Sequence, residues 1–77
     1  MKIEIYTKDF CVWCDRAKSL LNSKDLEFTE IDISDDLVRA EFYSNIGEGV
    51  KTVPQVFIDS KRIGGYQDLV TWFANGI

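Results

Sequence analysis

Residues 9–15 read DFCVWCD and contain both cysteines of this 77-residue chain, two residues apart. Residues 2–7, which precede them, alternate polar and apolar side chains, the period of a half-buried strand. Residues 12–24, which follow, contain no glycine or proline, and apolar side chains recur there at helical spacing. The sequence therefore predicts that the two cysteines lie where a strand passes into a helix.

The same two periodicities predict the remaining elements. In chain order they are a strand over residues 27–33, a helix ending at residue 46, strands over residues 53–59 and 61–63, and a helix over residues 67–75. Ser34 and Asp35 are helix-capping types, and Gly47 suits a helix end. The order β-α-β-α-β-β-α predicts an α/β fold with a parallel crossover and an antiparallel hairpin. We expect a four-stranded mixed sheet flanked by three helices, in a single domain over residues 1–77.

The composition argues against several classes of protein. The chain has 13 acidic and 9 basic residues, no histidine, and a formal net charge of -4. Because a phosphate backbone attracts basic proteins, we expect no nucleic-acid partner. The sequence has no apolar signal core and no apolar run long enough to span a membrane, so we expect a cytoplasmic protein without a membrane partner.

Two cysteines at this spacing have three readings: a structural disulfide, half of a metal site, or a redox pair. A disulfide closing so short a loop constrains the unfolded chain little, and structural disulfides are rare in reducing compartments. Structural zinc needs four thiolate or imidazole ligands, whereas this chain offers two thiols and no imidazole, so we expect no metal. A redox pair is favoured, and a cysteine hydrolase is disfavoured because no histidine is available as its base.

The position at a helix start assigns the two sulfurs different roles. Unpaired N–H groups and the helix dipole favour a thiolate at Cys11, and Lys8 adds a nearby cation. Cys14 follows one turn later, with its Cα about 5 Å from that of Cys11, which is within disulfide reach. We therefore expect Cys11 to attack and Cys14 to resolve the mixed disulfide, with Trp13 as a flat wall beside the thiolate.

Several linked segments resemble the glutaredoxin family of the thioredoxin-like superfamily, and the resemblance covers nearly the whole chain. These are Tyr6-Thr7-Lys8 before Cys11-Val12-Trp13-Cys14, then Thr52-Val53-Pro54, then Gly64-Gly65-Tyr66-Gln67-Asp68-Leu69. The small size is similar to that of bacterial and phage dithiol glutaredoxins. The resemblance implies a thioredoxin-like fold.

The resemblance also implies a glutathione site. Its residues would be Lys8, Trp13, Arg39, Thr52, Val53, Pro54, Gly65, Gln67 and Asp68. In the family the proline of the T-V-P loop is cis and faces the reactive cysteine, and the residue before it pairs with the glutathione backbone. Gln67 and Asp68 would hold the γ-glutamyl end, and Lys8 and Arg39 the glycyl carboxylate.

The implied activity is reduction of protein disulfides and glutathione mixed disulfides, with glutathione as reductant, by a monomer. The resemblance names ribonucleotide reductase as a candidate protein substrate. Two alternatives remain open: a donor recharged by a flavoprotein reductase, and a dimer in which Cys11 and two glutathiones hold a [2Fe–2S] cluster. The second arises because Val12 and Trp13 replace the proline and tyrosine of the family's common C-P-Y-C site, and this also leaves the redox potential undetermined.

Overall fold

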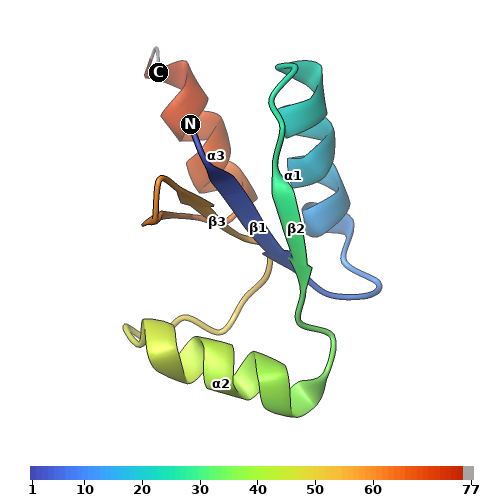
Figure 1. Ribbon diagram of the computed structural model, residues 1–77, viewed down its shortest axis with the longest axis vertical. Coiled ribbons are helices and arrows are strands. Elements are labelled where there is room, and N and C mark those ends of the chain that lie inside the picture. Colours follow the sequence, from blue (N-terminus) through green and yellow to red (C-terminus); the bar gives the residue numbers. More distant parts are fainter. Residues whose placement is uncertain (76–77) are drawn as a thin grey trace.

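The computed structural model describes residues 1–75 and confirms the predicted element order (Figure 1). The elements are β1 (Ile3–Thr7), α1 (Val12–Ser23), β2 (Thr29–Asp32), α2 (Asp36–Ile46), β3 (Gln55–Ile58), β4 (Lys61–Gly64) and α3 (Tyr66–Ala74). None of the helices in this described part of the chain is long and apolar enough to cross a membrane.

The four strands form one mixed sheet in the order β2-β1-β3-β4. β1 pairs with β2 in parallel and with β3 antiparallel, and β3 and β4 form an antiparallel hairpin. Asp59 and Ser60 make the hairpin turn, and both have positive φ angles of 50° and 70°. The parallel crossover and the hairpin are those predicted from the sequence.

One face of the sheet carries the core. The inward side chains of β1 and β3, such as Ile5 and Val56, are fully buried against Ala17 and Leu21 of α1 and Leu69 of α3. Figure 1 shows α1 and α3 standing side by side over this face, and the two helices are in contact. The helix that begins at the cysteine pair is therefore fixed to the best-packed part of the molecule.

The other face is covered more lightly, by α2. Phe42 of α2 stacks on Tyr6 of β1 with ring centroids 4.2 Å apart, and Phe57 of β3 packs edge-on against Tyr6 at 5.5 Å. None of the residues of α2 is buried, and Leu37 at its start is 82% exposed. In Figure 1 the helix lies crosswise below the sheet, near the ends of β1 and β2.

Several element boundaries differ from the predicted ones by one or two residues. β2 is shorter at both ends than the predicted strand. β3 begins at Gln55 rather than at residue 53, because Pro54 has no N–H to donate and the pairing with β1 starts at Gln55. Gly64 extends β4 instead of ending it. Its φ of 122° suits glycine, and an added Cβ would overlap the Asp68 carboxylate.

Candidate active site

Cys11 lies at the junction between β1 and α1, as predicted. It is the N-cap of α1, with extended backbone angles, and its sulfur accepts a hydrogen bond from the Cys14 backbone N–H at 3.1 Å. The chain reaches this position through Phe10, whose φ of 56° is left-handed and whose side chain is fully exposed. The geometry aims the helix start at the Cys11 sulfur, which is the arrangement that favours a thiolate.

Cys14 lies one turn further on and is joined to Cys11 by a disulfide, with the Cα atoms 5.2 Å apart. Cys14 is only 1% exposed, whereas Cys11 remains partly exposed. The predicted spacing is thus confirmed, and the two sulfurs differ in access to solvent. Only Cys11 can be reached by a large substrate.

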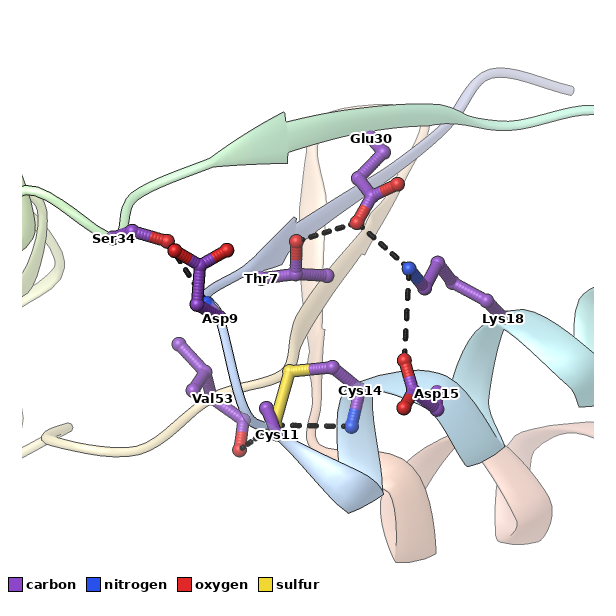
Figure 2. Close-up of polar contacts among 9 residues, drawn as sticks. All are labelled: Thr7, Asp9, Cys11, Cys14, Asp15, Lys18, Glu30, Ser34 and Val53. Carbon is purple, nitrogen blue, oxygen red and sulfur yellow. Dashed lines mark hydrogen bonds and ion pairs between the residues drawn. A yellow bond between two sulfur atoms is a disulfide. The ribbon is translucent and has the colours of Figure 1, made fainter.

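The loop before β3 closes over Cys11. The peptide bond between Val53 and Pro54 is cis, as the resemblance implied, and the Val53 carbonyl oxygen lies 3.8 Å from the Cys11 sulfur. Figure 2 shows this oxygen and the Cys14 N–H both directed at Cys11. Residues more than forty positions apart in the sequence therefore meet at the reactive sulfur.

A hollow of about 280 Å³ opens on one side of this contact, and we name it the α3 hollow. It is lined by Trp13, Thr52, Val53, Pro54, Gly65, Tyr66, Gln67 and Asp68, which include seven of the nine predicted glutathione-binding residues. Tyr66 was not predicted to line it; its ring lies 5.6 Å from that of Trp13. The Asp68 carboxylate accepts a hydrogen bond from the Gly65 N–H at 3.0 Å, so it also caps the start of α3.

A second hollow of about 470 Å³ adjoins the first at Trp13, Thr52 and Val53, and we name it the lysine hollow. It is lined by Lys8, Phe10, Cys11, Val12, Trp13, Tyr43, Lys51, Thr52 and Val53. Sequence reasoning missed Tyr43 and Lys51. Lys51 directly precedes the Thr52-Val53-Pro54 segment and could have been found from that position, whereas nothing local marked Tyr43. Burial is the main cause that raises the pKa of Tyr43, and the Arg39 charge partly offsets it, so the hydroxyl is protonated at neutral pH.

Arg39, also predicted to bind glutathione, lines neither hollow. Its guanidinium donates to the carbonyl oxygens of Ile33 and Ser34, at 3.2 and 2.8 Å, and pairs with Asp36 at 2.7 Å. These bonds tie the start of α2 to the end of β2. The structure therefore supplies Arg39 with partners within the chain, and its predicted ligand role remains a prediction.

A polar network that the sequence did not reveal lies beside Cys14 (Figure 2). The buried Thr7 hydroxyl donates to Glu30 at 2.7 Å, and Lys18 pairs with the same carboxylate at 3.0 Å and with Asp15 at 3.8 Å. The hydrogen bond from Thr7, followed by that from Lys18, lowers the pKa of Glu30, and the bond to Glu30 raises the pKa of Lys18. The network joins β1, β2 and α1 behind the disulfide.

The described residues 1–75 contain no group of three or more histidine, cysteine, aspartate or glutamate side chains that could hold a metal ion. The fold and the site define a thiol–disulfide oxidoreductase, which has a thioredoxin-like fold and a Cys11 and Cys14 pair that forms a disulfide.

Comparison with known proteins gives the family. A family model described as Glutaredoxin matches residues 3–63. Glutaredoxin 3 of Escherichia coli (strain K12) is 45% identical over 74 residues, covering 96% of this chain and 88% of the relative. The chain therefore belongs to the glutaredoxin family.

Solved structures agree with this assignment. Glutaredoxin 1 from Francisella tularensis, complexed with cacodylate, superposes with a TM-score of 0.88 at 32% identity, covering 96% of this chain and 93% of that one. The buckwheat glutaredoxin–glutathione complex superposes with a TM-score of 0.82 at 27% identity, covering 96% and 69%. The second of these neighbours was thus solved with glutathione.

Proposed function

We propose that this protein reduces protein disulfides and glutathione mixed disulfides with glutathione as its reductant. The observation that carries the proposal is the position of Cys11, which is partly exposed and lines the lysine hollow, next to an α3 hollow that offers different charged groups. The α3 hollow offers a helix start and a carboxylate, and the lysine hollow offers two ammonium groups. A tripeptide with a different charge at each end fits such a pair of hollows.

Glutathione has a γ-glutamyl end with a carboxylate and an ammonium, and a glycyl end with a carboxylate only. The N–H groups of Gln67 and Asp68, in the first turn of α3, suit the γ-glutamyl carboxylate, and the Asp68 side chain suits the ammonium. Lys8 and Lys51 suit the glycyl carboxylate, and neither forms any of the ion pairs found within residues 1–75. The Val53 backbone between the hollows suits the central cysteine.

Reduction of a protein disulfide proceeds in two exchanges. The Cys11 thiolate attacks one substrate sulfur, forming a bond to Cys11 while the substrate disulfide breaks and the departing thiolate takes up a proton. The Cys14 thiol loses its proton and attacks the Cys11 sulfur, which forms the Cys11–Cys14 disulfide and releases the second substrate thiol. Two electrons have passed from the protein to the substrate.

Glutathione then restores the dithiol. One glutathione thiolate attacks the Cys11 sulfur and releases Cys14, and a second attacks the bound glutathione sulfur and releases Cys11 with one glutathione disulfide. A glutathione mixed disulfide is handled at Cys11 alone: the thiolate takes the glutathione, the other thiol leaves, and a free glutathione clears Cys11. We further propose that the protein acts as a single-domain monomer in the cytoplasm, with ribonucleotide reductase as a candidate substrate.

The test is turnover of a glutathione mixed disulfide of cysteine with glutathione, glutathione reductase and NADPH. We expect NADPH consumption that requires both glutathione and this protein. Reduction of a protein disulfide at an equal rate with a flavoprotein thioredoxin reductase in place of glutathione would favour the rival reading, a donor that does not need glutathione.

A substitution in the α3 hollow makes the test specific to the site. Asp68→Asn keeps an oxygen that can accept from the Gly65 N–H but loses the charge that faces the ammonium. We expect its KM for the mixed disulfide to rise by about tenfold or more, the size of one charge-assisted hydrogen bond. Asp25→Asn, at an exposed turn outside the hollows, is the matched control and keeps the parental KM.

A further inference from the structure

A third hollow continues the groove beyond the lysine hollow, and we name it the α2 hollow. It has a volume of about 510 Å³ and is lined by Ala40, Tyr43, Ser44, Gly47, Gly49, Val50 and Lys51. It shares Tyr43 and Lys51 with the lysine hollow, which in turn shares Trp13, Thr52 and Val53 with the α3 hollow. The three hollows therefore form one row, with Cys11 lining the middle one.

Glutathione bound in the α3 and lysine hollows would not fill the α2 hollow. This step rests on the proposed function: with the γ-glutamyl end in the α3 hollow, the glycyl carboxylate ends the ligand beside Lys8 and Lys51. A protein substrate continues past this point, because its chain does not stop one residue after the target cysteine. An extended chain advances about 3.3 Å per residue. Since the α2 hollow adjoins the lysine hollow at Tyr43 and Lys51, we expect the second residue after the cysteine to lie at the α2 hollow.

The lining of the α2 hollow indicates which side chain it accepts. Its walls are the methyl group of Ala40, the side chain of Val50 and the ring of Tyr43, all on α2 or on the loop that returns above it in Figure 1. One cation lies where this hollow adjoins the lysine hollow, because Lys51 lines both. The nearby acidic residue of the loop, Glu48, pairs with Arg62 of β4 at 3.5 Å and so does not neutralise Lys51.

We propose that the lysine and α2 hollows together bind the two residues that follow the target cysteine of a protein substrate, an acidic residue first and an apolar residue second. The acidic side chain takes the place of the glycyl carboxylate between Lys8 and Lys51. The apolar side chain packs against Ala40 and Val50. Charge complementarity and continuity with the groove at Cys11 select this occupant over a second copy of the chain.

The experiment measures thiol exchange at Cys11 in the Cys14→Ser variant, in which the mixed disulfide cannot be resolved internally. The variant is first converted to its mixed disulfide by exchange with glutathione disulfide, which releases one glutathione, and a peptide thiol is then added. The peptide thiolate attacks the Cys11 sulfur and glutathione departs with the proton that the peptide gave up, so no net oxidation occurs. Mass spectrometry of the two mixed disulfides gives the exchange constant.

Two peptides of equal composition provide the comparison: in one, glutamate and leucine follow the cysteine, and in the other, they precede it. We expect the first to have an exchange constant at least about fivefold larger, because burial of a leucine side chain is worth more than this factor. Equal constants would overturn the proposal. A dimer whose interface buries Ala40 would also overturn the proposal, because a second copy of the chain would then occupy the α2 hollow.

Substitutions locate the effect. Ala40→Phe fills the α2 hollow from an exposed helix position, and we expect the ratio of the two exchange constants to fall toward one; Ala74→Phe, at an exposed position of α3, is the matched control and keeps the ratio. Lys51→Glu should remove the preference for glutamate, and Lys61→Glu on β4 should not. An unchanged ratio in Ala40→Phe overturns the proposal. If no mixed disulfide with glutathione forms at all, the proposed function fails together with the inference.

Discussion

Cys11 and Cys14 are the same residue type three positions apart, yet their surroundings differ in almost every respect. Cys11 caps the helix, is partly exposed, lies against the Val53 carbonyl and lines the lysine hollow. Cys14 is 1% exposed, on the helix face that packs on the sheet. A separation of one helical turn therefore distinguishes the Cys11 sulfur, which substrates can reach, from the Cys14 sulfur, which contacts only Cys11.

The largest effect is expected from removing the exposed sulfur. Cys11→Ser should lose at least about a thousandfold in turnover of both protein disulfides and glutathione mixed disulfides, because a serine hydroxyl without a base is a poor nucleophile. The coupled glutathione reductase assay measures both. Because Cys11 is partly exposed and serine can cap a helix, the melting temperature should stay near that of the reduced parent. Retained activity would mean that Cys11 is not the nucleophile.

Removing the buried sulfur should separate the two activities. Cys14→Ser should lose at least about a hundredfold on protein disulfides, since nothing then releases the substrate from Cys11. Its turnover of glutathione mixed disulfides should stay within about threefold of the parent, because free glutathione clears Cys11 without help. Parental rates on protein disulfides would show that Cys14 is not the resolving thiol.

Much of this site could be predicted from the sequence, because local pattern determines it. Strand alternation before Cys11 and helical spacing after it place both sulfurs. Pro54 and Gly65 were found through the family resemblance instead, since the strand pattern alone placed Pro54 inside β3. Tyr43 could not be found in this way, because it reaches the groove only through the packing of α2 on the sheet by Phe42 and Tyr6. Glu30 was equally hidden, because an exposed acid in a strand has no local sign of a partner in α1.

The difference between the sulfurs can be sharpened without substitutions. In the reduced protein near neutral pH, iodoacetamide should modify Cys11 at least about tenfold faster than Cys14, because Cys11 is both more exposed and placed at the helix start. Peptide mass spectrometry of a time course measures the two rates. In concentrated urea, where the helix is lost, the two rates should become nearly equal, and equal rates in the folded protein would contradict the role given to the helix start.

The smallest expected effect concerns the polar network beside Cys14. The pKa of Glu30 is lowered in the folded protein by Thr7 and Lys18, so the carboxylate contributes stability above its unfolded pKa and loses it as the pH falls through the lower folded value. The raised pKa of Lys18 has the opposite sign, so its contribution is present below its unfolded pKa and is lost only as the pH rises through the folded value in strongly alkaline solution.

Glu30→Gln tests this, because glutamine still accepts from the Thr7 hydroxyl but carries no charge for Lys18. At neutral pH the variant should be less stable than the parent by under about 1 kcal/mol, since the pair is partly exposed. The gap should close as the solution is acidified, because the parent then protonates Glu30. Urea unfolding of both proteins at several pH values measures the gap. Glu27→Gln is the matched control, because Glu27 is an exposed carboxylate three residues away that takes part in none of the ion pairs found within residues 1–75. A gap equally wide in acid, or an equal gap in Glu27→Gln, would show that the network does not stabilise the region around Cys14 by its charge.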